Sequence, residues 1–270
     1  MVNGNFGDAV MNPETPNICE YFLTHNPNLK INISSNASAG TQRFWEQLGK
    51  LKITVLFCLD GLEDTHHLYR QNTDWQKILK NAQTFIQAGG TAIWKMIQFD
   101  HNKHQIDACR QLSKDLGFND FEMVYDGRDS GPVYDRKGNL VHVIGDYQGE
   151  TDFKILFHKK KTDMVLLEDI SVVNKGKPIC QTQTGKQIYI SATGDVSPCC
   201  WTGFSPHTFG KGEYLEAVNA QIKPLATNNN ALENKLESCI EWFDGVEKRW
   251  NIEKFENGRL VVCNDNCGSA

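Results

Sequence analysis

The stretch ITVLFCLDG, residues 53 to 61, is a continuous apolar run that ends abruptly in Asp60 and Gly61. An apolar run this short, without polar alternation, is typical of a strand that is covered on both faces, as in parallel sheets. The next segment, residues 73 to 90, repeats apolar residues at spacings of three and four and stops at a glycine pair. The two segments together predict one βα unit of a parallel sheet.

The same alternation of strand-like and helix-like segments continues on both sides of this unit. Strand-like runs are KINISSN (30–36), TAIWKMIQFD (91–100) and FEMVYD (121–126), and helix-like runs are TQRFWEQLGKL (41–51) and KHQIDACRQLSKDLGF (103–118). We therefore predict an α/β fold in which residues 30 to 128 form consecutive parallel βα units of a partial barrel. Ligands of such folds bind at the carboxyl ends of the strands, which here read SSNAS, CLDG and FDHNKHQ.

The pattern changes after Gly127, and we predict three regions: a βα core over 1–128, a linker over 129–178 and a cysteine-rich α+β domain over 179–270. The linker contains YDRKGNLVHVIGDY, which predicts a hairpin around residues 137–139. The last region contains KQIYISATGDVSPCCW, a second predicted hairpin with its turn at 193–195. A helix is predicted over 228–250, with one apolar face made of Leu232, Leu236, Cys239, Ile240 and Phe243.

Charge and hydropathy exclude several classes of protein. The 270 residues carry a formal net charge of −5, and the basic residues are scattered apart from KKK at 159–161, so nucleic-acid binding is not expected. The longest apolar run, residues 53–59, is far shorter than the roughly 20 residues that span a membrane. The first thirty residues lack the basic and apolar regions of a secretory signal, so we expect a cytoplasmic protein.

Nine cysteines in a reducing compartment are better explained by metal or cluster ligation, or by burial, than by disulfides. Cys180 lies nineteen residues before Cys199, and Cys263 and Cys267 are separated by three residues near the end of the chain. A tetrahedral ion or a cluster needs four thiolates, and these four are the predicted ligands. Gly194 and Pro198 are expected to fix the chain before Cys199.

The remaining cysteines divide into reserve ligands and packing residues. Cys200 follows Cys199 directly and would point to the opposite side of an extended chain, so only one of the two is expected to be a ligand. Cys239 is expected in the core and is the other reserve ligand. Cys19, Cys58 and Cys109 lie within helix or strand patterns, and Cys19 and Cys109 are interpreted as packing. A site of four cysteines can hold a zinc ion equally well, so zinc is the alternative to an iron–sulfur cluster.

The spacing Cys-x13-Gly-x4-Cys, the SPCCW segment and the terminal CNDNC together resemble the auxiliary iron–sulfur domain of radical S-adenosylmethionine enzymes, of the SPASM or Twitch type. GNFGDAVMNP, near the start of the chain, resembles the glycine-rich motif of that family. SSNAS stands where the family often has TNG, and FCLDG resembles its fourth-strand SIDG. The resemblance covers nearly the whole chain and implies a partial radical S-adenosylmethionine barrel followed by an auxiliary 4Fe-4S domain.

The resemblance also implies contacts to the cofactor. Gly7 and Asp8 match the glycine–acid pair that holds the ammonium of S-adenosylmethionine, with aspartate in place of the usual glutamate. Ser35 and Asn36 would face the ribose hydroxyls. Asp60 has two interpretations: a further ribose contact, or an Asp-Gly turn that caps the strand.

The sequence departs from the family at the catalytic cluster. Its members bind that cluster through Cys-x3-Cys-x2-Cys after the first strand, and these 270 residues contain no such triplet. We therefore expect a fragment of a longer enzyme, because a parallel sheet without its first strands exposes an apolar edge. This chain alone is not expected to cleave the cofactor.

The resemblance implies a radical enzyme that modifies a peptide or protein substrate and draws its electrons from a separate donor. The alternative from another class is a non-catalytic module in which four cysteines hold zinc or a cluster on an α/β scaffold. The presence of a cysteine triplet upstream in the parent gene would discriminate between the two.

Overall fold

The structure is a computed structural model that describes residues 7–125, 131–135, 137–144, 176–185, 187–204 and 213–267. The chain forms two compact units, Met1–Thr151 and Asp152–Ala270, and each is described by itself. The break lies between residues 151 and 152. The predicted limits at 128 and 178 stay predictions.

The first unit is built on a four-stranded sheet in the order β1-β2-β3-β4. Its strands are β1 (Asn32–Ser35), β2 (Thr54–Cys58), β3 (Thr91–Gln98) and β4 (Asp120–Tyr125). All three neighbouring pairs are parallel, with Ser35 beside Phe57 and Cys58 beside Lys95 in the register. The predicted parallel α/β architecture is therefore confirmed, and the carboxyl ends of the strands lie at one edge.

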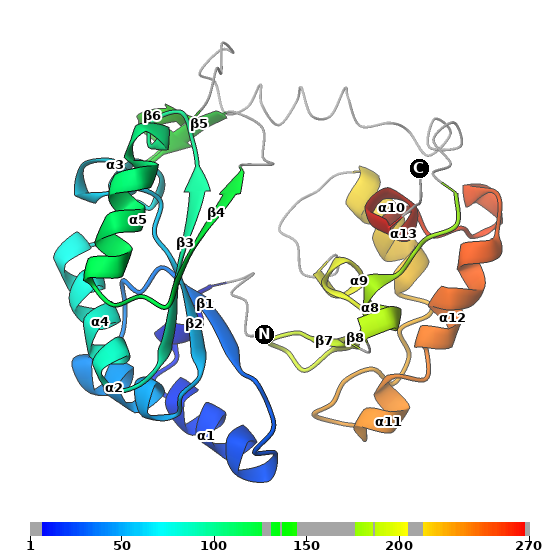
Figure 1. Ribbon diagram of the computed structural model, residues 1–270. Coiled ribbons are helices and arrows are strands. Elements are labelled where there is room, and N and C mark those ends of the chain that lie inside the picture. Colours follow the sequence, from blue (N-terminus) through cyan, green and yellow to red (C-terminus); the bar gives the residue numbers. More distant parts are fainter. Residues whose placement is uncertain are drawn as a thin grey trace. The chain divides into compact units, whose positions relative to one another are not determined.

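The connections between the strands are helical. They are α2 (Gln42–Lys50), α3 (Glu63–Tyr69), α4 (Trp75–Gln87), the short 3-10 turn η2 (Lys103–Gln105) and α5 (Ile106–Asp115), and they are preceded by η1 (Ala9–Met11) and α1 (Thr15–His25). Figure 1 shows α2, α4 and α5 side by side along one face of the sheet. The largest side chains between these helices and the strands are fully buried: Trp45, Trp94, Phe57 and Phe85.

Polar side chains and glycines set the ends of these helices. Thr41 and Asp74 accept hydrogen bonds from the third backbone N–H of α2 and α4, at 3.2 and 3.0 Å. Gly89 ends α4 with a φ of 98°, as the glycine pair predicted. Gly49 of α2 permits close packing on α4, since a Cβ there would lie 2.4 Å from the carbonyl oxygen of Phe85.

The hairpin predicted around residues 137–139 is present. β5 (Gly131–Tyr134) pairs antiparallel with β6 (Leu140–Ile144). The carboxylate of Asp135 holds the turn, because its Oδ1 accepts from the backbone N–H groups of both Lys137 and Asn139 at 2.8 Å. β6 contacts α3 within the first unit.

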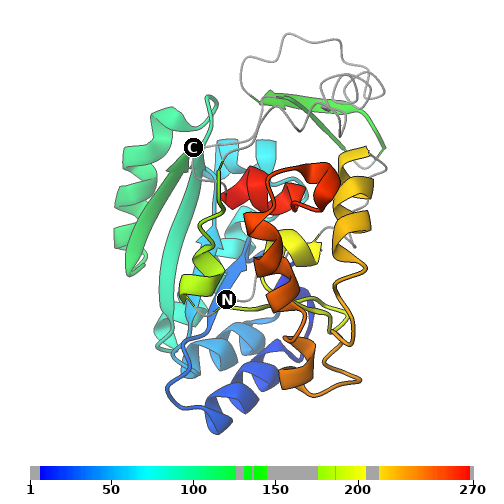
Figure 2. The same cartoon turned by 90° about the vertical axis from the view of Figure 1, so that its right-hand side faces the viewer.

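The second unit is mostly helical around a small hairpin. The elements are α8 (Gln181–Gly185), β7 (Tyr189–Ile190), β8 (Val196–Ser197), α9 (Cys200–Phe204), α10 (Glu213–Ile222), α11 (Leu236–Cys239), α12 (Phe243–Lys248), η4 (Arg249–Asn251), η5 (Phe255–Asn257) and α13 (Val261–Cys267). β7 and β8 are antiparallel, and Gly194 in their turn has a φ of 88°, which confirms the second predicted hairpin. Figure 2 gives a second view of these elements. Val218, Ile222, Trp242, Val246 and Leu260 form the core.

The single helix predicted over 228–250 is wrong. The structure has two short helices there, α11 and α12, and Leu232 is 82% exposed while Leu236 and Ile240 are also exposed. The asparagine run explains the difference, because Asn230 donates to the carbonyl of Thr193 at 3.0 Å and to Asp195 at 3.1 Å. Asparagine side chains that bind backbone elsewhere compete with helix formation.

No helix in the described ranges is both long and apolar enough to cross a membrane.

Candidate functional site

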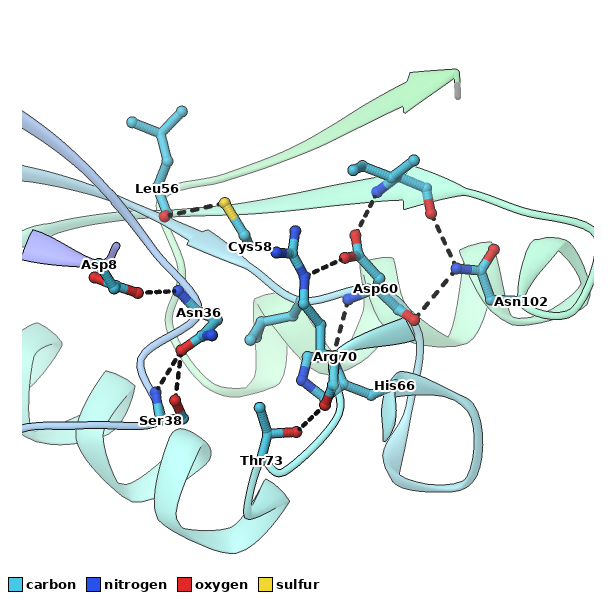
Figure 3. A network of polar contacts seen from close by, with 12 residues as sticks. Asp8, Asn36, Ser38, Leu56, Cys58, Asp60, His66, Arg70, Thr73 and Asn102 are labelled. Atoms are coloured by element: carbon cyan, nitrogen blue, oxygen red, sulfur yellow. Dashed lines mark hydrogen bonds and ion pairs between the residues drawn. The ribbon is translucent and has the colours of Figure 1, made fainter. Parts of the chain in front are cut away.

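Asp8 joins the start of the described chain to the end of β1. Its Oδ2 accepts from the Ser35 hydroxyl at 2.8 Å and from the Asn36 backbone N–H at 3.0 Å. Figure 3 shows the bond to Asn36. Its Oδ1 accepts from the backbone N–H of Val10 at 3.1 Å and so caps η1. The predicted cofactor residues Asp8, Ser35 and Asn36 therefore lie together at the carboxyl end of β1. Gly7 directly precedes Asp8 in the chain and has a φ of 155°.

The loop after β1 is fixed from inside. Ala37 adopts a left-handed φ of 57° and is completely buried, and its carbonyl accepts from the side chain of the buried Asn81 at 2.8 Å. The amide oxygen of Asn36 accepts from the backbone and hydroxyl of Ser38 at 3.0 and 2.6 Å. The side chains at this strand end are thus held in place before any ligand binds.

Asp60 at the end of β2 is completely buried and ion-paired. Its Oδ2 lies 2.7 Å from Nε of Arg70, and its Oδ1 accepts from the backbone N–H of Ile97 at 2.7 Å (Figure 3). Arg70 ends α3 and Ile97 belongs to β3, so the carboxylate ties three elements together. Both oxygens are used within the chain, and the predicted contact between Asp60 and a ribose stays a prediction.

His66 and Asn102 complete the network around Asp60. His66 Nδ1 accepts from the Asp60 backbone N–H at 3.1 Å, and the Asn102 amide donates to the carbonyls of Asp60 and Ile97 at 3.2 and 2.9 Å. Burial, and after it the positive charge of Arg70, lower the pKa of His66 to about 3, so the ring is neutral. The sequence reasoning missed His66 and Arg70. Their spacing from Asp60, six and ten residues, places them within α3 and just after it, and was the available signal.

Cys58 lies on the sheet face opposite the helices. Trp94 and Met96 of β3 are buried, so the alternation of a strand places Lys95 on the other face, beside Cys58 in the register. Burial raises the pKa of the Cys58 thiol, the Asp60 and Asp8 carboxylates add to that shift, and the Arg70 and Lys95 cations oppose it. The second face of the sheet therefore presents a half-buried thiol beside Lys95.

In the second unit, the four predicted metal ligands come from three elements. Cys180 precedes α8, Cys199 precedes α9, and Cys263 and Cys267 lie in α13. The backbone N–H of Ile179 donates to the carbonyl of Cys267 at 2.8 Å, which places Cys180 beside the end of α13. α9 contacts α13. The fold thus brings the cysteines near the start of this unit and those near its end to one region.

The thiols in this region act on one another electrostatically. Burial raises the pKa of Cys263 to about 12, and the neighbouring Cys199, Cys267 and Cys180 add to the shift. Burial raises the pKa of Cys267 as well, and Cys180, Cys199 and Cys200 contribute. Each thiolate makes the ionisation of its neighbours less favourable. A bound cation would remove this repulsion, because metals are ligated by thiolates and not by neutral thiols.

The reserve ligands behave differently from each other. Cys200 is exposed and is the first residue of α9, so the extended chain expected at Cys199 and Cys200 is wrong: a helix starts there. Cys239 is completely buried, and its sulfur lies 3.9 Å from the carbonyl of Asn234. Cys19 and Cys109 are buried in the core of the first unit, as predicted.

Among the described residues, no three His, Cys, Asp or Glu side chains form a preformed metal site.

An open hollow of about 590 Å³ borders the cysteine region in the second unit. Cys180, Gln183, Glu247 and the buried Trp250 are among the residues that line it. A ligand in this hollow would contact one of the four predicted ligand residues directly.

Comparison with known proteins gives a likeness in structure alone. No family model matches this sequence, and no curated protein matches it. Among solved structures, Streptococcus suis SuiB bound to S-adenosylmethionine matches with a TM-score of 0.53 and 15% identity, covering 98% of this chain and 60% of SuiB. SuiB by itself matches with a TM-score of 0.52 and 14% identity, over 90% of this chain and 56% of SuiB.

A third match is SuiB bound to its precursor peptide SuiA, with a TM-score of 0.50 and 14% identity, over 98% of this chain and 60% of SuiB. At these identities the likeness shows a shared fold. The chain spans less than two thirds of the length of SuiB in all three comparisons.

Proposed function

We propose that this chain is part of a radical S-adenosylmethionine enzyme that modifies a peptide or protein and carries an auxiliary 4Fe-4S cluster in its second unit. The observation that carries the proposal is the fold likeness to SuiB, which extends over 98% of this chain. The solved structures of SuiB include complexes with S-adenosylmethionine and with a precursor peptide. The proposed enzyme needs a separate electron donor.

The residues at the end of β1 fit the amino-acid part of S-adenosylmethionine. An ionised carboxylate has about four acceptor positions, and three hydrogen bonds from described residues already reach Asp8. One position remains for an ammonium group, and the bonds from Ser35 and Asn36 keep the carboxylate oriented. Gly7, Ser35 and Asn36 would complete the contacts, and Asp60, besides its predicted ribose contact, holds β2, α3 and β3 in place.

The donor set of the second unit fits an iron–sulfur cluster. Cys180, Cys199, Cys263 and Cys267 offer four soft thiolates, which suit iron–sulfur clusters and zinc. Cys263 is buried and the others are partly exposed, so one side of the group is shielded from water. These four residues would hold the cluster.

When bound beside a reduced cluster, S-adenosylmethionine supplies hydrogen-atom abstraction. The protein's part is to bind, orient and exclude water. Asp8, oriented by Ser35, would hold the ammonium group at a fixed point, and the Asp60–Arg70 pair ties the neighbouring strand ends together. Cys58 and Lys95 face the same side of the sheet and would border the substrate.

Binding of S-adenosylmethionine to the full chain tests the first half of the proposal. Asp8→Asn removes the charge that pairs with the ammonium, and we expect it to weaken binding about tenfold or more in calorimetry, as for loss of a charge-assisted hydrogen bond. Asp74→Asn is the matched control, because Asp74 also caps a helix but precedes α4. Equal affinities of the two variants would contradict the assignment of Asp8.

The proposal also predicts that this chain by itself does not cleave the cofactor. Because the 270 residues contain no Cys-x3-Cys-x2-Cys, we expect no 5′-deoxyadenosine from S-adenosylmethionine under a strong reductant. Addition of a segment that carries the triplet should restore cleavage. Product from the chain alone would mean that one of its own cysteines holds a catalytic cluster.

A further inference from the structure

A pair of histidines lies in the first unit at the carboxyl end of β3, where His101 directly precedes Asn102. His101 follows β3, and His142 lies in β6 of the hairpin. Their ring centres are 5.0 Å apart and the ring planes are nearly perpendicular, at 89°. His101 also stacks on Phe99, with ring centres 5.2 Å apart. The pair therefore joins the hairpin to the end of the sheet.

The ring nitrogens of this pair are buried without partners. Both nitrogens of His101 and Nε2 of His142 have no hydrogen-bond partner among the described residues. A buried polar atom left unpaired costs about 1–3 kcal/mol, and each such atom in a native protein calls for an explanation, such as a bound water or ion. One ion between the two rings would take one nitrogen of each, and the second nitrogen of His101 would need another partner, such as a water molecule.

The separation of the rings suits a shared metal ion. Metal–nitrogen bonds of about 2.0–2.1 Å put each ring centre roughly 3.2 Å from the ion, so two imidazoles at a tetrahedral angle have centres about 5 Å apart. The 5.0 Å between His101 and His142 agrees with that value. A water molecule between the nitrogens is the other way to satisfy them.

We propose that His101 and His142 bind one divalent first-row transition ion, such as Zn²⁺ or Ni²⁺, and so clamp the β5–β6 hairpin onto the end of β3. Imidazole is a preferred ligand of these ions. Two protein ligands leave the other positions to water, in keeping with the absence of three-residue sites in the described part of the chain. The site is separate from the cysteines and does not depend on the proposed function.

Nickel titration of the full, reduced chain tests the site. Thiols bind Ni²⁺ too, so the readout is the difference between variants: His142→Asn and His101→Asn should each lower the calorimetric stoichiometry by one ion per chain. Thiolate-to-nickel charge-transfer absorbance should stay the same, because it reports the cysteines. His25→Asn is the control, since His25 is exposed on α1 and should bind as the unmodified chain does.

Histidine ring signals in NMR provide a second measurement that needs no variant. Paramagnetic Ni²⁺ should broaden the signals of His101 and His142 at ratios below one ion per chain, before those of His25. An unchanged stoichiometry in both variants, or broadening that spares this pair, would overturn the proposal and leave a bridging water as the explanation.

Discussion

His66 is a buried titratable side chain that makes the stability of the first unit depend on pH. It is 1% exposed, its Nδ1 accepts a hydrogen bond, and burial lowers its pKa to about 3. In the unfolded chain its pKa is about 6.5. Between these values unfolding takes up a proton, so the free energy of unfolding falls as the pH drops, by up to about 1.4 kcal/mol per pH unit. Above pH 6.5 both states are neutral and the effect vanishes.

We therefore predict that His66→Gln flattens the pH dependence of stability. Glutamine can still accept from the Asp60 backbone but takes up no proton on unfolding. Urea unfolding at pH 7.5 and at pH 5 would measure the effect, and the loss of stability between the two values should be smaller in the variant by about 1 kcal/mol or more. An identical loss in both proteins would show that His66 is accessible to protons in the folded state.

The turn from β2 into α3 depends on the buried Asp60–Arg70 pair. Removal of one partner leaves a buried charge unpaired, so we predict that Asp60→Asn lowers the free energy of unfolding by about 3 kcal/mol. Glu46→Gln breaks the exposed Lys50–Glu46 pair of α2 and should have no measurable effect. Urea denaturation of both variants makes the comparison. A small effect at Asp60 would mean that water reaches this pair.

The contact between α2 and α4 depends on a glycine. In Gly49→Ala the new methyl would lie 2.4 Å from a backbone oxygen and 2.6 Å from the Ala88 side chain. Alanine favours helix by up to about 1 kcal/mol, but the clash forces the helices apart, and we predict a net loss of about 1–3 kcal/mol. Gly131→Ala is the control, because its Cβ would meet nothing within 4 Å. Thermal unfolding of both variants checks this, and equal stabilities would contradict the predicted packing.

The strands and helices of the first unit could be predicted because each carries a strong local signal. The apolar run at 53–59 predicts a buried strand. The spacing of Ile78, Ala82 and Phe85 predicts a helix with one buried face. The helix predicted over 228–250 failed because its apolar residues are few and an asparagine binds the hairpin instead. A local pattern cannot reveal such a long-range competitor.

At the scale of the whole molecule, the candidate sites are assembled from distant parts of the sequence. Asp8, Ser35 and Asn36 could be proposed because they match family motifs, and the structure places them in contact. The partners of Asp60 and the His101–His142 pair could not, since they depend on how loops and a hairpin pack. The cysteine spacing predicted a common region in the second unit, but it did not predict that a helix begins at Cys200.

Anaerobic reconstitution with iron and sulfide tests the central claim, that this chain carries an auxiliary cluster, most directly. We predict about four iron and four sulfide per chain, as for one 4Fe-4S cluster, with the matching absorbance. The signal should be lost in Cys199→Ala and retained in Cys109→Ala, whose cysteine is buried in the other unit. Failure of the chain to retain iron and sulfide, with or without binding of one zinc ion instead, or an equal signal in the two variants, would contradict the account.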